Sequence, residues 1–85
     1  MEIVFTRQAE KDFEKIKRNP ILLKKVIALL DLIEVNPFSN PPRYEKLIGF
    51  DHVYSRRINQ QHRLIYQTIQ PDNIIKIIRM WTHYE

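Results

Sequence analysis

The sequence predicts a small α+β domain in which a helical hairpin packs on a mainly antiparallel sheet, in the order β-α-α-β-β-β-β. Three observations lead to this prediction. The chain has 85 residues, which allow one domain, residues 1–85, with a modest core. Amphipathic helical spacing is confined to the first 36 residues. Alternating or β-branched runs dominate from residue 44 onward, as is typical of strands.

The residues before position 20 predict a short strand followed by a helix. Ile3-Val4-Phe5 is the strand candidate, and Thr6 is a suitable N-cap for the helix. Ala9, Phe13 and Ile16 then recur at helical spacing, with polar residues on the other faces. The first helix therefore presents one apolar face to a core.

A second helix is predicted from about Pro20 to Val35. Asn19 is a good N-cap and Pro20 suits the first helical position, so this pair ends one helix and begins the next. One side of this helix carries Leu23, Val26, Ile27, Leu30 and Ile33, and the apolar arc is widened by Leu22, Leu29 and Leu32. We expect two antiparallel helices joined by a tight turn, with packing on the sheet as their role.

A proline-rich connection separates the helices from the remaining strands. Asn36-Pro37 stops the second helix, and three prolines in six residues exclude regular hydrogen bonding up to Pro42. Phe38 is expected to fix this connection to the core. Tyr44 to Leu47 is a short extended segment, and Gly49, the only glycine, marks the turn that follows it.

Three further strands complete the prediction. Val53 to Ile58 and His62 to Ile69 alternate polar and apolar residues around Asn59-Gln60-Gln61, which predicts a β-hairpin. A turn at Gln70-Pro71-Asp72-Asn73 leads to Ile74 to Trp81, the most apolar run of the chain. Its β-branched composition favours a central or well-covered strand.

The hairpin concentrates positive charge. If Gln60 is the centre of a three-residue loop, Arg57 lies directly opposite Arg63 on one face of the sheet. Like charges at opposed positions destabilise a sheet, so this arrangement indicates a site for an anion. Arginine suits phosphate because its planar fork donates two hydrogen bonds at once. Arg56 faces away from Arg57, where we expect it to serve solubility or contact with ribosomal RNA.

The basic excess lies in the half of the chain that contains the hairpin. The net charge is +4; Met1 to Pro42 holds seven basic and six acidic residues, and the remainder holds seven basic and four acidic residues. The basic residues that can converge there are Arg43, Lys46, Arg56, Arg57, Arg63, Lys76 and Arg79. This distribution suits a polyanionic partner, and a solvated basic surface without a specific ligand is the alternative.

Composition limits the kinds of site and location. The chain has no cysteine, which excludes disulfides and thiolate metal sites and fits a reducing, cytoplasmic location. His52, His62 and His83 have no metal-ligand spacing, so we expect neither a metal nor another cofactor. A signal peptide and a membrane-spanning run are both absent, and we expect a soluble protein with no membrane partner.

The remaining polar residues fit metal-independent cleavage of RNA by its own 2′-hydroxyl. That reaction needs a base for the hydroxyl proton, an acid for the leaving 5′-oxygen and fixed positive charge at the phosphorus. A carboxylate at Glu45, the histidines and the arginine cluster supply these groups. An ordinary salt bridge from Glu45 to Arg43 or Lys46 is the alternative.

The sequence resembles the YoeB/Txe family of toxins in the RelE superfamily of bacterial toxin–antitoxin systems. The resemblance lies in the run Tyr54 to Tyr66, in Asn36-Pro37-Phe38 and Glu45-Lys46-Leu47, and in the terminal His83-Tyr84. It implies a RelE-like fold and a type II toxin that acts as an mRNA interferase, a ribosome-dependent endoribonuclease that inhibits translation. It also implies inhibition by a cognate antitoxin of the Phd/YefM type, and it leaves a homodimer open.

The resemblance also assigns roles to individual residues. Glu45 falls at the general base, Arg63 at the arginine that stabilises the scissile phosphate, and His83 at the general acid. Arg57 falls at a second phosphate-contacting arginine, and Tyr84 at the terminal aromatic that helps to position the substrate. Beyond the resemblance, we also expect Arg56 and Lys46 to contact the substrate. The chain departs from the family at Glu85, which extends past the usual terminal tyrosine, and at Trp81-Thr82.

Two other interpretations stay open. One is a non-catalytic module that binds nucleic acid or protein on the same scaffold, as in the related ParE-like toxins that poison DNA gyrase. The other is a degenerate toxin that retains only antitoxin binding. Mapping RNA ends after incubation with programmed ribosomes separates all three.

Overall fold

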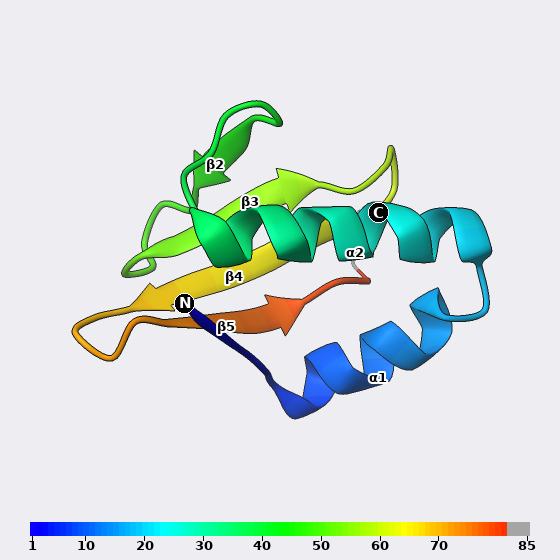
Figure 1. Cartoon of the computed structure of the whole chain (residues 1–85), viewed down its shortest axis with the longest axis horizontal. Coiled ribbons are helices and arrows are strands. Elements are labelled where there is room, and N and C mark those ends of the chain that lie inside the picture. Colours follow the sequence, from blue (N-terminus) through cyan, green and yellow to red (C-terminus); the bar gives the residue numbers. More distant parts are fainter. Residues whose placement is uncertain (82–85) are drawn as a thin grey trace.

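A helical hairpin and a five-stranded sheet make up the computed structural model, which describes residues 1–81. The elements in chain order are β1 (Glu2–Phe5), α1 (Arg7–Ile16), α2 (Pro20–Val35), β2 (Tyr44–Lys46), β3 (Val53–Arg57), β4 (Arg63–Ile69) and β5 (Ile74–Arg79). Helix α2 crosses in front of β3 and β4, whereas α1 contacts β5 and β1 (Figure 1). The predicted fold class and element order are confirmed.

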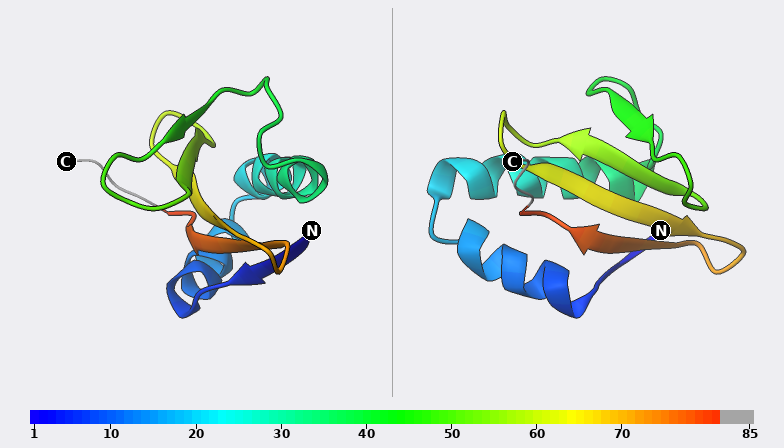
Figure 2. Two further views of the ribbon diagram at one scale, coloured as in Figure 1. Left: turned by 90° about the vertical axis from the view of Figure 1, so that its left-hand side faces the viewer. Right: turned by 180° about the vertical axis from the view of Figure 1, so that it is seen from behind.

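The sheet has the strand order β1-β5-β4-β3-β2. Strand β1 pairs with β5 in parallel, and the other three pairs are antiparallel. The apolar run predicted as a central strand is β5, which lies between β1 and β4 and buries Ile75 and Ile77 completely. Figure 2 shows from behind that, within residues 1–81, no helix covers β3 and β4 on the side away from α2.

Both helices begin where the sequence predicts. Thr6 Oγ1 accepts a hydrogen bond of 3.0 Å from the Ala9 N–H, and Asn19 Oδ1 accepts one of 3.2 Å from the Leu22 N–H. These bonds satisfy backbone donors that have no partner within the first turn of a helix. The buried side of α2 consists of Leu22, Val26, Leu29 and Ile33. The predicted apolar side was misplaced, because Ile27 is 44% exposed whereas Leu22 and Leu29, which were predicted only to widen the arc, are buried.

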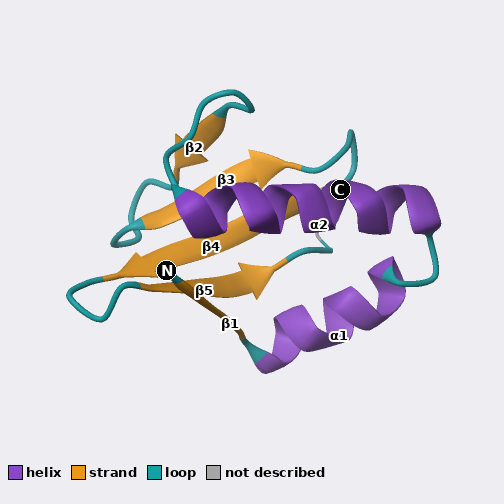
Figure 3. Cartoon of the chain, in the orientation of Figure 1, coloured by secondary structure: helices purple, strands orange, loops and turns teal. Residues whose placement is uncertain are grey.

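Arg56 of β3 fixes the proline-rich connection between α2 and β2. This guanidinium donates hydrogen bonds to the carbonyl oxygens of Pro37, Ser39 and Pro42. Its Nε also donates to Tyr66 Oη at 3.1 Å, and Tyr66 Oη donates to the Pro37 carbonyl at 2.7 Å. The connection appears as the long loop before β2 in Figure 3.

The expectation that Arg56 contacts RNA is wrong. Its side chain does face away from Arg57, but that side of β3 is the core side, and Arg56 has 0% exposure. A buried cation is tolerated when its donors are hydrogen-bonded, and here neutral oxygens accept from it. Arg56 therefore has a structural role and is not available to a substrate.

Burial also affects the hydroxyl that Arg56 contacts. Desolvation raises the pKa of Tyr66 above its ordinary value, and the neighbouring Arg56 guanidinium offsets part of this increase. Tyr66 therefore stays protonated and donates to the Pro37 carbonyl.

Candidate functional site

The arginine hairpin has the register that the sequence predicts. Arg57 of β3 lies directly opposite Arg63 of β4, and the Ile58 N–H donates to the His62 carbonyl at 2.9 Å. The turn needs no glycine because Asn59 Oδ1 accepts hydrogen bonds from the N–H groups of Gln61 and His62. The two guanidiniums therefore belong to the same face of the sheet.

Strand β2 adds a carboxylate to that face. Glu45 pairs with Ser55 of β3, and its Oε1 lies 3.9 Å from Nη1 of Arg63. The Glu45 side chain is 56% exposed and that of Arg63 is 25% exposed, so their ion pair is open to solvent. Such exposed pairs are weak and are readily exchanged for other partners.

These residues line a cavity of about 290 Å³. Its walls are formed by Pro42, Arg43, Glu45, Ser55, Arg57 and Arg63. Within residues 1–81, Arg57 has no salt-bridge partner, and the buried Ser55 hydroxyl has no hydrogen-bond partner. Three guanidiniums beside one carboxylate form a site suited to an anion.

The structure therefore brings together Glu45, Arg57 and Arg63 of the predicted site, and adds Arg43 and Ser55. Lys46 does not line this cavity, because successive strand residues point to opposite faces. It lines a different cavity of about 520 Å³, formed with residues 47–51. His83 and Tyr84 lie outside the described residues.

The described residues offer no metal-binding cluster and no membrane-spanning helix. Residues 1–81 contain no group of three or more His, Asp or Glu side chains that could hold a metal ion. In the same part of the chain, neither helix is long and apolar enough to cross a membrane.

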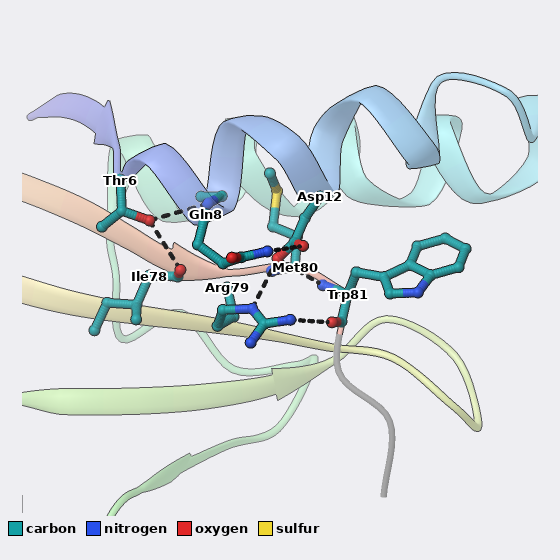
Figure 4. Close-up of polar contacts among 8 residues, drawn as sticks. Thr6, Gln8, Asp12, Ile78, Arg79, Met80 and Trp81 are labelled. Carbon is teal, nitrogen blue, oxygen red and sulfur yellow. Dashed lines mark hydrogen bonds and ion pairs between the residues drawn. The ribbon is translucent and has the colours of Figure 1, made fainter.

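One polar residue that the sequence analysis did not identify is buried beside the end of β5. Asp12 of α1 is fully buried and accepts hydrogen bonds from Gln8, Arg79, Met80 and Trp81 (Figure 4). The sequence did contain a sign that Asp12 is buried, because Asp12 falls at helical spacing between Ala9 and Ile16, on the face that packs on the core.

Trp81 contacts two other parts of the protein. Its ring stacks on His62, with ring centroids 4.1 Å apart and an interplanar angle of 29°. Lys15 Nζ of α1 lies 5.7 Å from the Trp81 ring centroid. The sequence left Trp81 open between a core residue and a stacking surface; it is partly exposed and stacks on a side chain of its own chain.

Comparison with known proteins identifies the family to which this chain is similar. Residues 3–85 match the family model described as the ParE toxin of type II toxin-antitoxin system, parDE. Toxin YoeB of Synechocystis sp. is 33% identical over 87 residues, which cover 100% of this chain and 99% of that protein. Two solved structures from Staphylococcus aureus, a YoeB-YefM complex and a YoeB dimer, are 37% identical, with TM-scores of 0.83 and 0.84. Each match covers 99% of this chain and 98% of the other.

The family model bears the ParE name, whereas the relatives named above, which match over nearly their whole length, are YoeB proteins. The fold and the full-length matches agree with the resemblance seen in the sequence. The chain belongs to the YoeB family of toxins of type II toxin–antitoxin systems.

Proposed function

We propose that this toxin is a ribosome-dependent endoribonuclease that cleaves mRNA through attack of a 2′-hydroxyl on the adjacent phosphorus. The observation that carries the proposal is the meeting of Glu45, Arg57 and Arg63 in one cavity. The cavity lies on the side of β3 that faces away from the buried Arg56, where a long polymer can approach.

In the proposed reaction Glu45 is the general base. It accepts the proton of the 2′-hydroxyl while the 2′-oxygen forms a bond to phosphorus. The guanidiniums of Arg57 and Arg63 hold the non-bridging oxygens and stabilise the additional negative charge of the phosphorane. Arg63 already lies 3.9 Å from Glu45, so a phosphate bound there is close to both the base and the cation.

The leaving group requires a proton donor. As the bond from phosphorus to the 5′-oxygen breaks, His83 donates a proton to that oxygen, and Tyr84 positions the substrate; both roles come from the family resemblance. The products are a 2′,3′-cyclic phosphate, which water can open to a 3′-phosphate, and a 5′-hydroxyl. The residues in these roles supply acid, base and positive charge, so the chemical step needs no metal.

We also propose a protein partner. A YoeB relative with 37% identity forms a complex with YefM, which supports a cognate antitoxin of the Phd/YefM type for this chain. The basic excess of the second half would attract an acidic or amphipathic segment, which would cover or distort the cavity. A related YoeB dimer with the same identity supports a homodimer as the form of the free toxin.

The decisive experiment incubates the purified chain with ribosomes programmed with a defined mRNA and maps the ends of the products. We expect cleavage that leaves 2′,3′-cyclic phosphate or 3′-phosphate ends and is lost in Glu45→Gln. Products with 5′-phosphate and 3′-hydroxyl ends would reject the mechanism, because attack by the 2′-hydroxyl cannot generate them. Inhibition of translation without cleavage would favour the non-catalytic alternative.

A further inference from the structure

We propose that Asp12 is a positioning residue that fixes where the chain leaves β5 and thereby places the C-terminal segment for RNA cleavage. The functional part of this inference rests on the proposed endoribonuclease activity, in which His83 and Tyr84 take part. Asp12 lies on α1, far in sequence from the residues of the cavity.

Both carboxylate oxygens of Asp12 are used. Oδ2 accepts hydrogen bonds from Arg79 Nε at 3.0 Å, from the Met80 N–H at 3.0 Å and from the Trp81 N–H at 3.2 Å. Oδ1 accepts one from Gln8 Nε2 at 3.1 Å. Figure 4 shows these groups converging on the one side chain.

The backbone donors lie just beyond the sheet. Strand β5 ends at Arg79, so the Met80 and Trp81 N–H groups follow the last residue of the strand. Asp12 gives these donors an acceptor after the sheet has ended, as a capping side chain does at the end of a helix. The direction of the chain is therefore fixed for two residues past β5.

Arg79 strengthens the same connection. Its Nη2 donates to the Trp81 carbonyl at 2.8 Å, while its Nε donates to Asp12. The N–H and the C=O of Trp81 are thus both held by this pair of side chains. The Trp81 ring is held separately, by stacking on His62 and by contact with Lys15.

The electrostatic environment keeps Asp12 charged. Burial alone raises the pKa of this carboxyl group, but hydrogen bonds from Met80, Gln8 and Arg79, with the Arg79 charge, lower it below its ordinary value. A charged acceptor forms stronger hydrogen bonds to backbone N–H groups than a neutral one.

The contacts that fix Trp81 matter for cleavage because the proposed acid, His83, is only two residues beyond Trp81 in the sequence. Two residues of fully extended chain span at most about 7 Å. Fixing Trp81 therefore limits the volume in which the proposed acid can act. A misplacement of about 1 Å in a catalytic group can reduce the rate about 100-fold.

The test compares Asp12→Asn with Glu10→Gln, which also replaces a carboxylate by an amide but at an exposed position of α1. Trp81 is the only tryptophan, so acrylamide quenching of its fluorescence reports on the start of the C-terminal segment alone. Circular dichroism establishes that each variant is folded. Single-turnover cleavage over a range of ribosome concentrations gives the maximal rate and the half-saturating concentration separately.

We expect folded Asp12→Asn to show stronger quenching of Trp81 and a maximal rate about 10- to 100-fold lower, with an unchanged half-saturating concentration. Glu10→Gln should match the wild type in Trp81 quenching, maximal rate and half-saturating concentration. Unchanged quenching, a wild-type rate, or a loss confined to the half-saturating concentration would each overturn the proposal.

Arg79→Lys is a second variant in case Asp12→Asn does not fold. It keeps a positive charge beside Asp12 but lacks the fork that reaches Asp12 and the Trp81 carbonyl together. We expect stronger Trp81 quenching and a lower maximal rate, and wild-type behaviour in both would overturn the proposal. If the wild-type protein itself does not cleave RNA, the proposed function fails, and the quenching data still decide whether Asp12 holds Trp81.

Discussion

Arg57 of β3 and Arg63 of β4 form a directly opposed cross-strand pair, in which two like charges share one face of the sheet. An opposed pair of this kind is destabilising, and the ion pair between Glu45 and Arg63, at 3.9 Å, is open to solvent. A bound phosphate would compensate both guanidiniums at once. The unfavourable arrangement in the free protein would thus become favourable in the proposed complex with RNA.

Replacing either of these arginines should separate activity from stability. Arg57→Ala and Arg63→Ala should each lower single-turnover cleavage about 10²- to 10³-fold, because each removes a donor to the phosphorane. For Arg57→Ala, urea denaturation should show a change within about 0.5 kcal/mol or a small gain, because a like-charge contact is removed. Lys24→Ala on the exposed part of α2 is the control. Wild-type rates in both arginine variants would contradict the proposed site.

Replacing the neighbouring Arg56 should mainly lower the stability of the protein. Arg56→Leu leaves the carbonyls of Ser39 and Pro42 without their Arg56 donor and removes one of the two donors to the Pro37 carbonyl, so it should lower the free energy of unfolding by about 3 kcal/mol or more. Arg57→Leu, one residue away on the exposed side, is the matched control and should change stability little. Urea denaturation of both variants measures the difference, and equal stabilities would contradict the role given to Arg56.

Asp12 should contribute to stability in a pH-dependent way. Because its pKa in the folded protein lies below the ordinary value of 3.8, the contribution is complete above that pH and is lost as the pH falls below it. The difference in unfolding free energy between wild type and Asp12→Asn should therefore be largest near neutral pH and should narrow below pH 3.8. Urea denaturation at a series of pH values measures it. A difference that stays constant through this range would be inconsistent with a charged Asp12.

Glu45→Gln should remove the proposed base while preserving the fold. The side chain is 56% exposed and its ion pair is weak, so stability should change little. Loss of a general base typically lowers a rate about 10²- to 10⁴-fold. Ribosomes themselves require magnesium, so the metal dependence is tested with slow cleavage of an isolated RNA in the presence of EDTA. Cleavage by the wild type that stops on chelation would count against the metal-independent step.

Local patterns were sufficient to predict most of the fold. Thr6 and Asn19-Pro20 identified both helix starts, because capping depends on residues that are close in sequence. The alternation around Asn59-Gln60-Gln61 predicted the register that places Arg57 opposite Arg63. The part of the site that depends on one hairpin was therefore accessible from the sequence.

The features that the sequence did not predict correctly depend on contacts between residues that are far apart in the sequence or on different faces of a strand. Alternation showed that Arg56 and Arg57 face opposite ways, but only the fold shows that the carbonyls between 37 and 42 surround Arg56. Asp12 accepts from residues 67 to 69 positions away, which no periodicity reveals. Lys46 was predicted to contact the substrate, but it is adjacent to Glu45 in a strand, and adjacent strand residues point to opposite faces.

The opposite orientations of Arg56 and Arg57 have a consequence for genetic selections. Cells that survive production of this toxin would carry substitutions at either codon, since one change removes the buried anchor and the other removes a charge from the cavity. The first kind of survivor would contain little of the protein, because unfolded chains are degraded, and the second would contain normal amounts of an inactive one. An immunoblot of the survivors would separate the two classes. The substitutions in survivors with normal amounts of toxin would then identify the residues needed for its activity.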